Sequence, residues 1–208
     1  KAQGIYVKIS MHFSTLWHPD RVEEGDRIGK LNNTQYYYDE THQALYLEAL
    51  EAFMTHRNPH TGNTYAEEKA LNMFKVVNES SMFFNTVDSL PGPYRVKLQK
   101  KFNQWLREKY GSPLALLEAW NVEDAERALG NDESLARDTV ATLSIGSLSR
   151  VEPKHRKRAA DQTKFYFELE QAWGKRVKQA LRDMGSETLV QLSSWGGPGH
   201  LSELQSLS

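Results

Sequence analysis

Three short apolar runs along the chain have the pattern of β-strands. They are Gly4–Met11, Met73–Val77 and Thr188–Ser193, each bounded by polar or turn-forming residues. The long segments between them show helical periodicity, so the strands are expected to pair in parallel through crossover helices. The pattern therefore predicts the α/β class.

Apolar residues at helical spacing predict one helix before the second strand and several after it. The first spans about 37–56 and stops before Asn58-Pro59, because the residue before a proline avoids the helical region. Gly111 can end the next helix in a left-handed conformation, and Ser112-Pro113 starts another in the favoured capping order. A long helix is expected from about Arg158 to Met184.

A polar pair, Asn78-Glu79, follows the second strand directly and leads into the polar loop Ser80–Asn85. The Glu79 carboxylate is therefore expected at the carboxyl end of a buried strand. In barrels of alternating strands and helices, this end of each strand carries the catalytic residues. A solvated or salt-bridged glutamate is the alternative interpretation of the same pattern.

Composition narrows the classes of partner. With 208 residues, of which 39% are hydrophobic, the chain is long enough for one domain with a real core, and residues 1–208 are expected to form a single domain. Nothing in the sequence supports the alternative of two small domains. A net charge of -1 gives no overall attraction to nucleic acid or to an anionic membrane, and no apolar run approaches a membrane span. The absence of cysteine excludes disulfides and thiolate metal sites and leaves the compartment open, with a secreted or periplasmic location consistent.

Two further clusters favour ordinary surface roles. Histidines and an aspartate between positions 12 and 60 lack the short spacing of metal ligands, so neither a metal site nor a cofactor is implied. The basic run Lys154–Arg158 is the strongest sign of nucleic-acid binding. In a chain of this net charge, however, it is more typical of a solvated face or of the start of a helix.

Several motifs around the polar pair together resemble a known family. They are Asn58-Pro59-His60-Thr61-Gly62, Asn78-Glu79, Phe102–Ser112 and Glu118-Ala119-Trp120. This set resembles the clan A glycoside hydrolases, with cellulase-like and β-galactosidase-like members as the nearest likenesses. The resemblance implies a partial (β/α)8 TIM barrel, roughly strands three to five with their helices, as part of a longer polypeptide.

The same resemblance implies roles for individual residues. Glu79 would be the general acid/base of a retaining mechanism, and Asn78 would hydrogen-bond the sugar hydroxyl next to the anomeric carbon. His12 matches a histidine often found at the end of the third strand, although a core histidine bound to a carbonyl explains it equally well. Independently of the family, Trp17 and Trp195 lie in expected loops after strands, where their rings could stack on sugar faces.

The nucleophile of such an enzyme is a second carboxylate, which in this clan is a glutamate ending strand seven. Glu203 is a poor candidate because no strand precedes it. The leading hypothesis is therefore an enzyme whose carbohydrate substrate is cleaved only with the remainder of the barrel, supplied by the same or another chain. The alternative is a non-catalytic carbohydrate-binding or interaction protein derived from such a barrel. Either way, three strands alone are expected to expose a sheet edge and an apolar inner surface.

Overall fold

The computed structural model describes residues 4–11, 33–120 and 128–193. Its centre is a parallel sheet of three strands in the order β1-β2-β3, which confirms the predicted α/β class and the parallel pairing. The strands are β1 (Val7–Ser10), β2 (Leu71–Lys75) and β3 (Leu189–Gln191). Strands β1 and β3 are shorter than the apolar runs that predicted them, and β2 begins and ends two residues earlier than its run.

The helices occupy the positions that periodicity predicted, with ends shifted by a few residues. The α-helices are α2 (Glu40–Met54), α3 (Gly92–Tyr110), α4 (Pro113–Trp120), α5 (Ile145–Ser149) and α6 (Arg156–Asp183). Short 3-10 helices lie between them: η3 (Asn33–Tyr37), η4 (Asn85–Val87), η5 (Leu135–Arg137) and η6 (Pro153–His155).

Local sequence explains where these helices begin and end. The side chain of Asp39 accepts a hydrogen bond from the backbone nitrogen of His42 and so caps α2. Gly111 ends α3 with a φ of +74°, a conformation that glycine adopts at little cost. Ser112 then caps α4, since its hydroxyl accepts from the nitrogen of Ala115. The predicted roles of Gly111 and Ser112 are confirmed.

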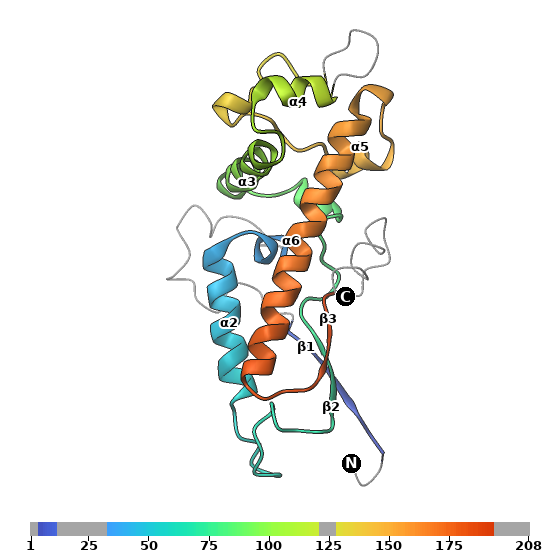
Figure 1. Ribbon diagram of the computed structural model, residues 1–208. Coiled ribbons are helices and arrows are strands. Elements are labelled where there is room, and N and C mark those ends of the chain that lie inside the picture. Colours follow the sequence, from blue (N-terminus) through green and yellow to red (C-terminus); the bar gives the residue numbers. More distant parts are fainter. Residues whose placement is uncertain (1–3, 12–32, 121–127, 194–208) are drawn as a thin grey trace.

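Helices α2 and α6 pack side by side against one face of the sheet, while α3, α4 and α5 lie beyond the carboxyl ends of its strands (Figure 1). Each connection between consecutive strands therefore returns through a helix on the same face. This winding is compatible with a segment of a barrel and also with one half of an open parallel sheet.

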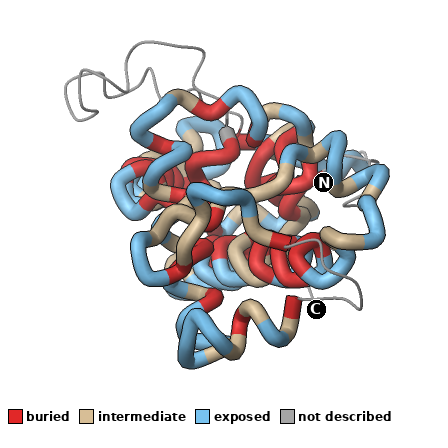
Figure 2. Tube along the Cα trace, turned by 90° about the horizontal axis from the view of Figure 1, so that it is seen from above, coloured by how far each residue is buried: buried red, intermediate tan, exposed pale blue. Residues whose placement is uncertain are grey.

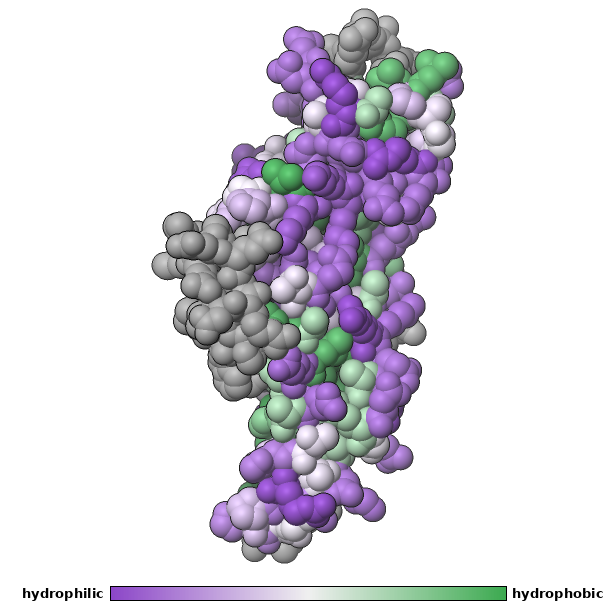
Figure 3. Space-filling view, turned by 90° about the vertical axis from the view of Figure 1, so that its left-hand side faces the viewer, coloured by the Kyte–Doolittle hydropathy of each residue, from purple (hydrophilic) through white to green (hydrophobic). Residues whose placement is uncertain are grey.

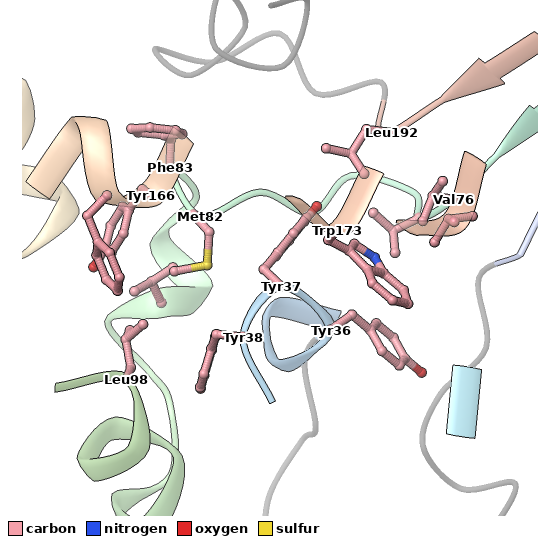
Figure 4. Packing of buried hydrophobic residues seen from close by; sticks show 14 of the residues in the cluster. Tyr36, Tyr37, Tyr38, Val76, Met82, Phe83, Leu98, Tyr166, Trp173 and Leu192 are labelled. Atoms are coloured by element: carbon pink, nitrogen blue, oxygen red, sulfur yellow. The ribbon is translucent and has the colours of Figure 1, made fainter. Parts of the chain in front are cut away.

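The core joins the sheet to the helices above it. Tyrosines of η3 lie between Trp173 and Val76 on one side and Met82 and Leu98 on the other (Figure 4). The ring of Trp173 meets the ring of Tyr46 edge to face at 5.1 Å between centroids. Buried segments accordingly run through the middle of the molecule rather than forming separate clusters (Figure 2).

The two faces of the sheet differ in polarity. Phe74 shares the helix-covered face with Ile9 and Val190, its partners in register, and is fully buried. The opposite face carries Lys8, Ser10, Lys75 and Gln191 beside Met73 and Leu189. The expectation of an apolar inner surface is therefore wrong for the described strands, because polar residues occupy most of its positions.

The outer edge of the described sheet at β1 is exposed, as expected for three strands that do not close on themselves. Ile5, Tyr6 and Val7 are 64%, 68% and 46% exposed, which is unusual for three consecutive apolar residues. In contrast, the side of the molecule seen in Figure 3 is covered mainly by hydrophilic residues, with apolar ones scattered among them. The exposed apolar surface of the described residues therefore includes the start of the edge strand β1 and the two residues before it.

Candidate functional site

The Asn78-Glu79 pair lies at the carboxyl end of the central strand, as the sequence predicted. After β2 the backbone stays extended, since the nitrogens of Val76 and Val77 donate to the carbonyls of Gln191 and Leu192. Asn78 is half-buried and Glu79 is exposed. The Glu79 carboxylate is thus presented at the end of the sheet where parallel α/β proteins carry their active sites.

The backbone at Glu79 adopts a strained conformation. Its φ is +47°, and Asp138 is the other described residue besides glycines with a positive φ. For a residue with a long side chain, the left-handed region costs about 1 to 2 kcal/mol, so surrounding contacts must hold it in place. Strain of this kind concentrates at functional sites, which distinguishes Glu79 from an ordinary surface glutamate.

Hydrogen bonds from two directions hold the residue after Glu79. The Tyr37 hydroxyl donates to the carbonyl oxygen of Ser80 at 2.8 Å, and the Ser80 nitrogen donates to the hydroxyl oxygen of Ser193 at 3.3 Å. Both anchors are buried, and they belong to η3 and to the segment after β3. Parts of the chain far apart in sequence therefore fix the turn that carries the carboxylate.

A third anchor comes from α6. One carboxylate oxygen of Glu170 accepts hydrogen bonds from the Met82 nitrogen at 2.6 Å and from the Ser81 hydroxyl at 2.8 Å. Glu170 is fully buried, where a carboxylate is tolerated only with such donors. The sequence did not reveal this role, because Glu170 falls within an amphipathic helix and its partners lie nearly ninety positions away.

The face of the sheet opposite Phe74, called the open face below, carries polar side chains close to Asn78 and Glu79. The Lys75 ammonium donates to the side-chain oxygen of Asn78, and the Lys8 ammonium donates to Gln191 at 2.6 Å. Burial lowers the pKa of Lys75 and the cation of Lys8 lowers it further, whereas the Glu79 carboxylate acts in the opposite direction. Lys75 therefore lies within electrostatic reach of Glu79.

A second polar cluster joins α2 to α3. One nitrogen of the His42 ring lies 2.6 Å from the Asp39 carboxylate and the other lies 3.1 Å from the Tyr94 hydroxyl, while Lys97 donates to Asp39 at 3.0 Å. This order of groups resembles a catalytic relay. However, Asp39, His42 and Tyr94 are at most 2% exposed, so a substrate cannot reach them and the cluster is structural.

Other candidate regions do not form a site. A groove of about 850 Å³ includes Leu71 and Leu189, the first residues of β2 and β3, so it lies at the end of the sheet opposite Glu79. Arg158 of the basic run is buried against Glu133, which leaves less of that run for an anionic partner.

No group of potential metal ligands occurs within 4–11, 33–120 and 128–193, and no helix described there is long and apolar enough to cross a membrane.

Three predicted substrate-binding residues, His12, Trp17 and Trp195, lie outside the described residues, so their roles stay predictions. The remaining tryptophans are core residues, as expected: Trp120 and Trp173 are buried, and the half-buried Trp105 packs against the core. Comparison of the chain with protein families, with curated proteins and with solved structures found no match.

Proposed function

We propose that this chain carries the acid/base segment of a retaining glycoside hydrolase that cleaves β-linked oligo- or polysaccharides. The observation that supports this proposal best is the position of Glu79: an exposed carboxylate, in a strained backbone conformation, at the carboxyl end of the central parallel strand. The sequence resemblance to clan A glycosidases assigns the acid/base to the same residue. The three strands would then be roughly strands three to five of a (β/α)8 barrel.

In this mechanism Glu79 has two tasks. It first donates a proton to the leaving glycosidic oxygen while a second carboxylate attacks the anomeric carbon, which forms a covalent glycosyl-enzyme. Glu79, now ionised, then takes a proton from the water that hydrolyses this intermediate. An exposed carboxylate on a fixed turn suits both steps, because it reaches substrate and water without moving the backbone.

The second carboxylate belongs, in this proposal, to the remainder of the barrel in the same or another chain. A retaining mechanism needs it about 5 to 5.5 Å from the Glu79 carboxyl group. The exposed edge at Ile5–Val7 supports the presence of further strands that pair with β1. Asn78 would bind the hydroxyl next to the anomeric carbon, with His12, Trp17 and Trp195 completing the sugar site.

The stereochemistry of hydrolysis tests this proposal. The intact protein is incubated with nitrophenyl β-glucoside and β-galactoside, and the first-formed anomer is identified by proton NMR. A β-anomer as first product supports the retaining mechanism, whereas the α-anomer contradicts it. Sugar binding measured by calorimetry without any hydrolysis would favour the alternative, a carbohydrate-binding protein that has lost catalysis.

The matched variants are Glu79→Gln and Glu51→Gln. Glu51 is exposed on α2 and belongs to neither the turn nor the open face of the sheet. Glu79→Gln should abolish most of the hydrolysis while Glu51→Gln leaves it unchanged. A similar loss in both variants would show that the effect is not specific to the strand end.

A further inference from the structure

Lys75 is a buried cation on the face of the sheet opposite Phe74, at a position where an apolar side chain would be easier to accommodate. It is 8% exposed and belongs to the central strand, and burial lowers the pKa of its ammonium, which is therefore partly desolvated. Burial of an ammonium is costly unless hydrogen bonds compensate for it. Lys75 donates a hydrogen bond to the side chain of Asn78, the residue next to the candidate acid/base.

We propose that Lys75 is a positioning residue that orients the Asn78 amide so that its NH2 group donates to the substrate hydroxyl next to the anomeric carbon. This inference rests on the proposed function. It goes further by naming which end of Asn78 meets the sugar and which residue determines this.

The direction of the Lys75–Asn78 hydrogen bond determines how the Asn78 amide is oriented. An ammonium has three donors and no acceptor, so it can bind only the oxygen of the amide. With that oxygen held by Lys75, the amide cannot rotate by half a turn without placing its NH2 group against the ammonium. The amide nitrogen is then the group directed elsewhere, and it recognises a hydroxyl as an acceptor.

Neighbouring residues keep Lys75 in this role. Within the described part of the chain, Lys8 from β1 and Glu79 are charged groups that act on Lys75, and β3 contributes the neutral Gln191 on the same face. Lys8 is engaged with Gln191 and repels a second ammonium, which favours extension of Lys75 toward Asn78 and Glu79.

The test compares a nitrophenyl β-glycoside with its 2-deoxy counterpart in the intact protein. For each variant the ratio of the two kcat/KM values is measured and divided by the ratio for the unaltered protein, which cancels the intrinsic difference in reactivity. Asn78→Ala should lower this ratio about tenfold or more, because it removes the contact with the hydroxyl. Lys75→Met should lower it by a similar factor, and the double variant should lower it no further.

Two further variants separate orientation from packing. Lys75→Arg keeps a charged donor, whereas Lys75→Met keeps only the approximate volume of the side chain. The ratio should therefore fall less in Lys75→Arg than in Lys75→Met. Lys69→Met removes an exposed lysine near the opposite end of the sheet, beside Leu71, and should leave the ratio unchanged. If Lys75→Met slows both substrates equally, Lys75 only supports packing and the inference is overturned.

A measurement without substrate distinguishes this inference from the proposed function. In the nitrogen-15 spectrum, the side-chain amide of Asn78 should give one sharp pair of resonances, which broadens or doubles in Lys75→Met as the amide rotates. An unchanged pair in Lys75→Met overturns the inference whether or not the protein hydrolyses glycosides. Full activity of Glu79→Gln, by contrast, would overturn the proposed function and leave this spectral test valid.

Discussion

The carboxylate of Glu170 lies 2.6 Å from the backbone nitrogen of Met82, and this contact ties the middle of α6 to the loop after β2. The same oxygen accepts from the Ser81 hydroxyl. Glu170 therefore supports the turn that carries Asn78 and Glu79 without contacting either. The candidate site depends on a helix whose sequence begins more than seventy residues later.

Replacing Glu170 should destabilise the protein in proportion to the hydrogen bonds lost. Glu170→Ala leaves two buried donors unsatisfied and should lower the free energy of unfolding by about 3 kcal/mol, measured by urea denaturation. Glu170→Gln keeps a carbonyl oxygen for the same donors, so it should lower the free energy of unfolding by less than Glu170→Ala does. The control, Glu51→Ala on exposed α2, should change it by less than about 0.5 kcal/mol. Equal stability of the two Glu170 variants would contradict the role assigned to this oxygen.

The buried Asp39 cluster predicts a dependence of stability on pH. Burial alone would raise the pKa of Asp39, but hydrogen bonds from His42 and Lys97 outweigh it and hold the pKa well below its usual range. Because the folded pKa is depressed, the stabilisation is fully present above the unfolded pKa, about 3.9, and is lost as the pH falls below it.

Asp39→Asn should therefore cost about 3 kcal/mol at pH 7, and the difference from the unaltered protein should narrow between about pH 4 and pH 2. Urea denaturation at several pH values measures both quantities. Lys101→Met, which removes a more exposed ion pair at the same end of α2, is the control and should show a small effect. A difference that is constant with pH would mean that the Asp39 charge contributes nothing.

Gly111 provides a test of backbone conformation alone. A methyl group added at Gly111 would meet no atom within 4 Å, so Gly111→Ala should cost about 1 kcal/mol through its φ of +74°. Gly92 is equally open and its φ is not positive, so Gly92→Ala should be neutral or stabilising. Thermal unfolding of the two variants measures this contrast. Similar melting temperatures would show that the end of α3 adapts without strain.

Local signals predicted the fold better than they predicted the site. Gly111 and Ser112-Pro113 fix helix ends through short-range geometry, so the sequence alone was sufficient there. Asn78 and Glu79 were predictable because an apolar run ends next to them. The supports of the site were not, since Lys75 resembles an ordinary strand lysine and Glu170 an ordinary helix glutamate until distant segments are brought together.

The η3 segment was missed for a related reason. Five residues of 3-10 helix are too few to show a periodicity of their own, so the helix was predicted to begin at about residue 37. In the structure Tyr37 belongs to η3 and α2 begins only at Glu40. In the fold, Tyr36 packs against Trp173 and Tyr37 binds Ser80. Aromatic residues of this kind gain their role from tertiary contacts that no local pattern reveals.

The most direct test of the account measures how the loss in Glu79→Gln depends on the leaving group. In the intact protein, glutamine keeps the size of the side chain but removes the proton donor, which is worth about a hundredfold to ten-thousandfold in rate. We expect a loss of this size for a natural β-linked oligosaccharide. A smaller loss is expected in the first step for a dinitrophenyl glycoside, whose leaving group needs little protonation. Equal losses on both substrates, or no loss on either, would contradict the assignment of Glu79 as the general acid.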